Sequence, residues 1–218
     1  QKKHYVPPMR ILLRTLKITT GAYKANCYII YCKDTNEGTL IDPGDEPDRI
    51  LDKIKNKGLK IKYIILTHGH GDHIGAVKKV MKRLNIPLLA HEDEKELLMD
   101  AAKNLSNIMV FGPTELMADK LLKDGDVIEF GNLKAEIIHT PGHTAGGICI
   151  KVGNNLITGD TIFKGSIGRT DLYSGDYRTL IKSIKNKLLL LDNKMVILPG
   201  HGEASTIGNE KVSNPFLN

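Results

Sequence analysis

Hydrophobic residues along the chain fall into short continuous runs, which are typical of buried strands, and into stripes spaced three to four residues apart, which are typical of helices. The runs predict strands over residues 10–18, 26–31, 39–42 and 63–66 in the first half. In the second half they predict strands over residues 127–130, 133–138, 147–152, 156–158 and 195–198. Strands therefore open each half and helices follow them, which indicates two sheets packed face to face with helices outside, a four-layer α/β fold.

Four further stretches predict the helices that accompany these strands. The first helix begins at Asp45-Glu46-Pro47, where acidic residues and a first-turn proline favour a helix start, and it ends at Gly58. The second places its apolar residues on one face, namely Ile74, Val77, Val80, Met81 and Leu84. The other two helices are expected over residues 92–103 and 177–191.

The chain of 218 residues has no Pro/Ser-rich linker, and we expect one domain at residues 9–218. Residues 1–8 are basic and begin with Gln, so we interpret them as an appended segment or a disordered tail. They lack the apolar stretch of a secretory signal. No apolar run reaches the roughly 20 residues that a membrane span needs. We therefore expect a cytoplasmic protein without a membrane partner.

Charge and cysteine usage narrow the classes of partner. The net charge is +6, but the lysines are spread over the predicted helices and do not form one tract. With 7 Tyr, 4 Phe and no Trp, there is little sign of an aromatic platform for bases. We therefore expect no nucleic-acid partner, and the charge favours a small anionic substrate. The cysteines are interpreted as buried thiols in a reducing compartment: Cys27, Cys32 and Cys149.

The segment Thr67-His68-Gly69-His70-Gly71-Asp72-His73 joins a predicted strand to a predicted helix and concentrates metal-binding side chains. Its glycines let the backbone bend so that three imidazoles and a carboxylate converge. Imidazole and carboxylate ligands suit zinc, iron or manganese. A histidine-rich loop that binds no metal is the alternative interpretation.

Three more metal-binding side chains follow predicted strands and stand beside Gly or Pro turns: His143, Asp160 and His201. The carboxyl ends of strands are where α/β sheets build sites. Seven candidates exceed the four ligands of one tetrahedral ion, and they fit two ions that share a carboxylate. Asp160 suits the shared position, because a carboxylate spans two metals and an imidazole does not. The candidate ligands are His68, His70, Asp72, His73, His143, Asp160 and His201.

Several stretches resemble the metallo-β-lactamase superfamily and, within it, the glyoxalase II-like branch of single-domain hydrolases. The stretches are Asn26-Cys27-Tyr28, Leu40-Ile41-Asp42-Pro43-Gly44, residues 67–73, 139–144, 158–163 and 165–172, and Leu198-Pro199-Gly200-His201-Gly202. The resemblance implies an αββα four-layer sandwich with two mixed sheets and outer helices.

The resemblance also implies how the ligands are divided between two ions. The first ion would be held by His68, His70 and His143. The second would be held by Asp72, His73 and His201. Asp160 would bridge the two ions, and Asp42 would support a ligand histidine or its loop.

The activity implied by the resemblance is metal-dependent hydrolysis of a thioester, such as a hydroxyacyl-glutathione, by a metal-bridging hydroxide. Zinc is the first expectation for the two divalent ions, with iron and manganese as alternatives, and they would lower the pKa of bound water to roughly 7. Asp72 and Asp160 are the catalytic residues expected to orient the hydroxide. Arg169 is expected to bind a substrate carboxylate. A structural salt bridge from Arg169 to Asp171 or Asp176 is an equal alternative.

The runner-up activity is an iron-dependent persulfide dioxygenase, which would hold one iron with the first-site histidines and Asp160. Those enzymes often carry Cys just before the Gly168-Arg169 pair. This chain has Gly165-Ser166-Ile167 there, which favours the hydrolase. Zinc β-lactamases place a cysteine at the position of Asp160, which argues against antibiotic hydrolysis.

Other departures and alternatives concern specificity. Two-domain glyoxalase II enzymes continue into a helical glutathione-binding domain, whereas this chain ends at Asn218, soon after His201, so the thiol carrier stays open. Lactonase, nuclease and non-catalytic metal-binding roles are weaker alternatives. The oligomeric state is left open.

Overall fold

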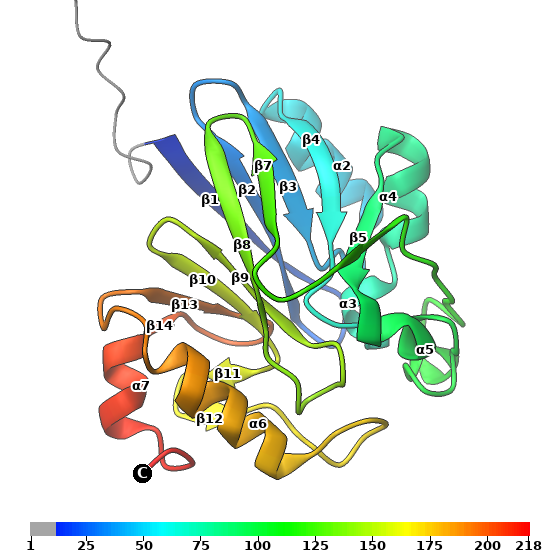
Figure 1. Ribbon diagram of the computed structural model, residues 1–218. Coiled ribbons are helices and arrows are strands. Elements are labelled where there is room, and N and C mark those ends of the chain that lie inside the picture. Colours follow the sequence, from blue (N-terminus) through cyan, green and yellow to red (C-terminus); the bar gives the residue numbers. More distant parts are fainter. Residues whose placement is uncertain (1–11) are drawn as a thin grey trace, which may run out of the picture.

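The computed structural model describes residues 12–218 and has four layers, with helices on the outer faces of two six-stranded sheets (Figure 1). In spatial order the first sheet contains β1 (Leu13–Thr20), β2 (Ala25–Cys32), β3 (Glu37–Ile41), β4 (Lys60–Ile65), β5 (Leu88–His91) and β6 (Lys120–Leu122). The second contains β14 (Ser205–Thr206), β13 (Val196–Pro199), β10 (Asn155–Gly159), β9 (Ile148–Val152), β8 (Leu133–His139) and β7 (Val127–Phe130). A small ribbon pairs β11 (Ile162–Phe163) with β12 (Ser166–Ile167). The α/β sandwich expected from the sequence is confirmed.

Both large sheets are mixed. In the first sheet β1, β2 and β3 pair antiparallel, whereas β3, β4, β5 and β6 pair parallel. In the second sheet the β10–β13 pair is parallel and the other pairs are antiparallel. Parallel neighbours end at the same edge of a sheet, so the loops that follow them gather there.

The helices lie outside the sheets and have local reasons to begin where they do. Beside the first sheet are α2 (Pro47–Asn56), α3 (Gly71–Ile74), α4 (Val77–Leu84) and α5 (Lys95–Leu98), the last preceded by the 3-10 turn η1 (Glu92–Glu94). Beside the second are α6 (Tyr177–Ser183), its π-helical continuation Ile184–Leu188, and α7 (Ile207–Ser213). Pro47 occupies the first turn of α2, and Asp176 caps α6 by accepting a 2.7 Å hydrogen bond from the Thr179 amide.

Three hydrophobic cores hold the four layers together, because the strand residues alternate between the two faces of each sheet. On β2, Cys27 and Ile29 face α2 and α4, while Tyr28 and Ile30 face the second sheet. The third core packs α6 and α7 against the outer face of the second sheet, with Cys149 in it. All three cysteines are free and buried, as predicted.

Two predicted helices differ from the structure. The helix expected from Ile74 to Leu84 is divided, since α3 ends at Ile74 and α4 begins at Val77. The helix expected over residues 92–103 ends at Leu98. Beyond it, the side chain of Asp100 accepts hydrogen bonds from the amides of Ala102 and Lys103, which favours a turn over a continued helix.

Some elements were not predicted at all, namely β5, β6, the short ribbon β11–β12, β14 and α7. The predicted tail at residues 1–8 and the first residues of the predicted opening strand lie outside the described part of the chain. Within residues 12–218, no helix combines the length and apolar character that a bilayer crossing requires.

Candidate metal centre

All seven candidate ligands meet at one end of the sandwich, where the two sheets present the ends of four strands. His68 and His70 lie in the loop between β4 and α3, and Asp72 and His73 lie in α3 itself. The other three stand on the second sheet: His143 lies between β8 and β9, Asp160 follows β10, and His201 follows β13. The sequence prediction that these side chains converge agrees with the arrangement of the strands.

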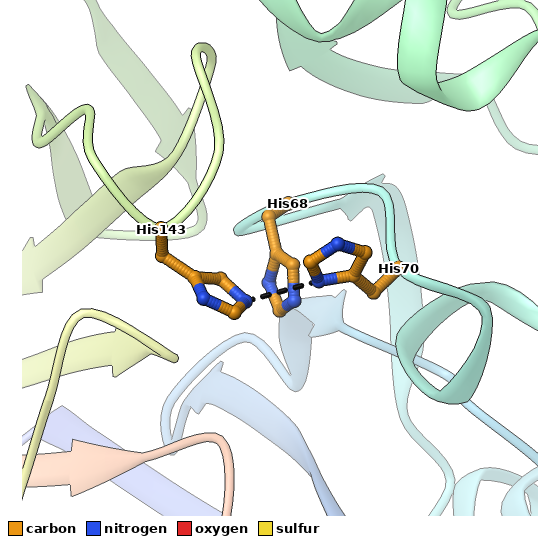
Figure 2. A group of neighbouring side chains, drawn as sticks. All are labelled: His68, His70 and His143. Atoms are coloured by element: carbon orange, nitrogen blue, oxygen red, sulfur yellow. Dashed lines mark hydrogen bonds between the residues drawn. The ribbon is translucent and has the colours of Figure 1, made fainter. Parts of the chain in front are cut away.

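His68, His70 and His143 form a first triad, in which one ring nitrogen of each lies within 4.8 Å of the others (Figure 2). Nδ1 of His70 lies 3.0 Å from Nε2 of His143, and His68 stands between them in the view. All three rings are buried. The rings come from two different halves of the chain, so this triad depends on how the two sheets are held against one another.

Asp72, His73 and His201 form a second triad, in which one ligand atom of each residue again lies within 4.8 Å of the others. Nε2 of His201 lies 3.0 Å from Oδ2 of Asp72 and 3.3 Å from Nε2 of His73. His73 is completely buried, whereas Asp72 and His201 are partly exposed. The second triad therefore lies on the more open side of the site.

The carboxylate of Asp160 lies between the two triads. Its Oδ1 is 3.4 Å from Nε2 of His73, while its Oδ2 is 3.7 Å from Nε2 of His143 and 3.6 Å from Nε2 of His201. Oδ1 is buried without a hydrogen-bond partner, and so are Nε2 of His68 and Nε2 of His70. Buried polar atoms are normally satisfied, so these unpartnered atoms and the N/O donor set fit divalent cations between them.

The electrostatics of His68, His70 and Asp160 agree with this fit. Burial lowers the pKa of His68 well below its ordinary value and lowers that of His70 to about 3, so both rings are neutral, the form that binds a metal. Burial raises the pKa of Asp160, but the neighbouring His73 outweighs burial, and the pKa ends well below its ordinary value. Burial opposes charge on His73 too, but the carboxylates of Asp72 and Asp160 outweigh it and raise that pKa. Because its own pKa lies well below the ordinary value, Asp160 is ionised.

Three of the histidines are oriented through Nδ1, which leaves Nε2 directed to the centre. Nδ1 of His73 donates to Oδ2 of Asp42 over 3.0 Å, and Nδ1 of His143 donates to the Arg169 carbonyl over 2.7 Å. Nδ1 of His68 lies 3.1 Å from Oγ1 of Thr67, whose hydroxyl donates to Asp42. Such partners fix the ring and its tautomer. Asp42 therefore supports both a ligand histidine and the loop, as predicted, whereas the part played by the Arg169 carbonyl was missed.

The loop that carries His201 is held by β2. Nδ2 of Asn26 donates to the carbonyls of Pro199 (3.1 Å) and Gly202 (3.0 Å), and the Tyr28 hydroxyl donates to the Pro199 carbonyl (2.7 Å). Gly200 is needed in this loop because a Cβ there would overlap Oδ1 of Asp160 and lie 2.8 Å from Cε1 of His73. These contacts explain why the Asn26-Cys27-Tyr28 stretch accompanies the ligand motifs.

The Arg169 side chain forms a bidentate ion pair with Asp171, with distances of 2.7 and 2.8 Å. This is one of the two partners that were considered for it from the sequence. Both side chains are more than half exposed, at 60% and 68%. Exposed pairs contribute little to stability, so this pair does not prevent Arg169 from engaging a ligand.

Glu94 is a buried acidic residue that the sequence did not single out. It accepts hydrogen bonds from the Gly69 amide over 2.8 Å and from the Gly146 amide over 2.8 Å. Its neighbours in an acidic helix start, Glu92 and Asp93, are exposed. No pattern of residue types distinguishes Glu94 from them, although helical spacing places it on the same face as Leu97 and Leu98.

His91 and His139 make structural hydrogen bonds away from the two triads. Nδ1 of His91 accepts a hydrogen bond from the Asp93 amide over 3.2 Å, which caps η1, and Nε2 of His139 donates to the Ala145 carbonyl over 2.8 Å. The two rings stack with centroids 3.8 Å apart. Although the two histidines and Asp93 lie close enough to hold an ion, both of these nitrogens are already engaged.

Comparison with known sequences assigns the family. Residues 20–201 match the model of the metallo-beta-lactamase superfamily. The chain is 37% identical to hydroxyacylglutathione hydrolase GloC of Haemophilus influenzae over 209 residues, which is 92% of this chain and 96% of that protein.

Solved structures agree with the sequence comparison. BLEG-1 B3 metallo-beta-lactamase superposes with a TM-score of 0.89 and 36% identity, covering 94% of this chain and all of that one (100%). TTHA1623 in a di-iron-bound form superposes with a TM-score of 0.83 and 33% identity, covering 93% of this chain and 100% of that one. ETHE1 from Myxococcus xanthus superposes with a TM-score of 0.79 and 25% identity, covering 93% of this chain and 83% of that one. This chain belongs to the metallo-β-lactamase superfamily.

Proposed function

We propose that this protein is a thioester hydrolase with two divalent metal ions, acting on a small anionic substrate such as a hydroxyacyl-glutathione. The observation that supports it best is the division of seven side chains into two triads with the Asp160 carboxylate between them. His68, His70 and His143 would hold the first ion, and Asp72, His73 and His201 the second. Asp160 would be shared. A structural zinc site is closed by four ligands, and this set is larger.

Two bound ions would supply a hydroxide at neutral pH and polarise the substrate carbonyl. Within the protein, the carboxylates of Asp72 and Asp160 accept hydrogen bonds and thereby orient the attacking oxygen. Both lie close to His73, whose Nε2 is 3.6 Å from Asp72 and 3.4 Å from Asp160. A thioester suits this chemistry because its thiol has a pKa near 8.5 and departs as thiolate without a strong general acid.

The substrate class rests on two supports. The relative GloC is named a hydroxyacylglutathione hydrolase and aligns with nearly the whole chain. The exposed guanidinium of Arg169 stands on the segment whose backbone orients His143, so a substrate carboxylate bound by it would lie beside the first triad. We propose zinc as the metal, with iron and manganese as alternatives for an N/O ligand set. The free, buried cysteines support a reducing, cytoplasmic location.

A second candidate is the iron-dependent persulfide dioxygenase, which would use only the first triad and Asp160. The likeness to ETHE1 favours it, as does the di-iron form of TTHA1623 as a sign that the fold accepts iron. The complete second triad fits the hydrolase, which would use Asp72, His73 and His201 for its second ion.

The proposal is tested by assaying one metal-loaded sample for three activities. S-lactoylglutathione hydrolysis is followed by the thiol released, oxygen uptake with glutathione persulfide is followed at an electrode, and nitrocefin hydrolysis covers the activity named for BLEG-1. We expect thioester turnover that disappears in His143→Ala. Oxygen uptake without thioester turnover would identify the dioxygenase, and nitrocefin turnover alone would identify a β-lactamase.

A further inference from the structure

Glu94 is a buried carboxylate that connects the two loops of the first triad. It lies in η1, beyond β5, and only 1% of its surface is exposed. Burying a carboxylate is unfavourable unless hydrogen bonds compensate for the lost water. The contacts that compensate Glu94 therefore show what this residue is for.

Its two oxygens bind different halves of the molecule. Oε1 accepts the amide hydrogen of Gly69 over 2.8 Å. Oε2 accepts the amide hydrogen of Gly146 over 2.8 Å and the hydroxyl hydrogen of Thr144 over 3.1 Å. A Cβ on Gly146 would lie 2.5 Å from the Glu94 amide nitrogen, so the close approach requires glycine there.

The bonded groups are the immediate neighbours of ligands. Gly69 stands between His68 and His70, and Thr144 follows His143. One side chain thus spans the loop after β4 on the first sheet and the loop after β8 on the second sheet. Because the carboxylate is rigid and its oxygens are a fixed distance apart, it sets how far the His68–His70 loop lies from the His143 loop.

The second triad has no such connection to Glu94. His73 is held from Asp42, and the His201 loop is held by Asn26 and Tyr28. Loss of the Glu94 contacts would therefore disturb the first triad selectively. Burial raises the pKa of Glu94 to about 7, although the hydrogen bonds from Gly69, Thr144 and Gly146 oppose this rise.

We propose that Glu94 is a positioning residue that fixes the spacing of the first triad and so determines the affinity of the first metal ion. This inference rests on the proposed metal centre and adds to it a residue that binds no ion and no substrate.

The test measures the affinities of metal-free protein for Zn²⁺ by competition with a chromophoric chelator. Glu94→Gln keeps the shape of the side chain but presents an amide donor to either Gly69 or the Thr144–Gly146 pair. We expect this variant to lower the affinity for the first ion roughly 10- to 100-fold, the usual effect of losing a group that orients a ligand. The affinity for the second ion should be unchanged. The same factor is expected in a His201→Ala background, where the second triad is incomplete. The Co²⁺-substituted absorption spectrum should change as well.

Two further variants complete the design. Glu92→Gln lies on the same turn with an exposed side chain and should bind both ions like the wild type. Thr144→Val removes one donor from Oε2 and should weaken the first ion by roughly three- to tenfold, the size of one hydrogen bond. If Glu94→Gln does not fold, Thr144→Val decides the question by itself.

A selective loss of the first ion supports the role of Glu94. Wild-type affinity, or equal weakening of both ions, overturns it, because a merely structural role would affect both triads alike. If the wild type binds one ion only, the two-ion function fails, while the effect of Glu94→Gln on that remaining ion still decides the positioning role.

Discussion

Oδ2 of Asp42 accepts a hydrogen bond from Nδ1 of His73 over 3.0 Å, and both side chains are almost completely buried. The same carboxylate also accepts the amide hydrogen of Thr67 over 2.8 Å. Asp42 thus ties the ring of a second-triad ligand to the loop that carries the first triad. Its backbone has a φ of 51°, a conformation that Asn tolerates better than most residues do.

Asp42→Asn is expected to weaken metal binding without abolishing the fold. The amide nitrogen of Asn accepts no hydrogen bond, so when the amide oxygen keeps the Thr67 amide, His73 loses its orienting partner. We expect the second ion to bind roughly 10- to 100-fold more weakly, measured by chelator competition. Asp48→Asn, which alters only an exposed pair with Lys79, is the matched control. Unchanged affinity in Asp42→Asn would show that His73 needs no partner.

Gly200→Ala should damage the site although Gly200 supplies no ligand. The new methyl group would overlap Oδ1 of Asp160 and press on the ring of His73. We expect loss of metal and a fall in thioester turnover of at least roughly 100-fold, as misplacement of about 1 Å at a reacting centre produces. The measurements are metal content and turnover of the purified variant.

Gly58→Ala provides the control for this substitution. Gly58 has a φ of +62° and open space around it, and it lies before β4 whereas the site follows β4, so alanine costs roughly 1 kcal/mol of stability through backbone strain. Its turnover and metal content should match the wild type. If Gly200→Ala behaves like Gly58→Ala, the close approach at Asp160 has no catalytic importance.

Arg169→Gln separates a substrate-binding side chain from a structural one. If the guanidinium binds a substrate carboxylate, KM for S-lactoylglutathione should rise roughly tenfold or more while metal content and thermal stability stay the same. Asp171→Asn should keep or lower KM, because it releases Arg169 from its ion pair. An unchanged KM in Arg169→Gln would leave the ion pair with Asp171 as its only role.

The three cysteines should be unreactive in the folded protein. Burial raises the pKa of Cys149 to about 11 and that of Cys27 well above its ordinary value. Burial also raises the pKa of Cys32, but hydrogen bonds from Asn132 and Thr35 outweigh it and lower that pKa; this thiol is protected because it has no exposed surface. We expect no reaction with a disulfide reagent at pH 8 in the native state and three equivalents in guanidinium chloride. Rapid reaction of a native thiol would show that a core opens readily.

Much of the fold and the convergence of the candidate ligands was predictable, because both depend on local patterns. The strand before Thr67 is a continuous apolar run, and glycine-spaced histidines at its end indicate convergence in any α/β sheet. The interruption of the helix at Gly75 and the turn at Asp100 were not predicted. The Ala76 amide donates to the Pro43 carbonyl over 3.0 Å, and the Asp100 side chain accepts the Ala102 amide hydrogen over 2.9 Å. Hydrophobic periodicity reports neither contact.

The residues that orient the candidate ligands were harder to predict from the sequence. Asp42 was found through its motif, but Glu94 is one of three consecutive acidic residues, and its burial is decided by packing against loops about 25 and 50 positions away. The carbonyl of Arg169 orients His143, and a backbone contact of this kind leaves no trace in the residue type. Such long-range contacts require the folded structure.

The proposed function requires that two ions are bound with Asp160 between them. The decisive measurement is the metal content of the wild type and of Asp160→Asn by elemental analysis after loading with Zn²⁺ and removal of free metal. The account predicts about two ions per chain in the wild type and fewer than two in the variant, since one amide oxygen cannot serve both ions. One ion per chain in the wild type, or two retained in Asp160→Asn, would contradict it.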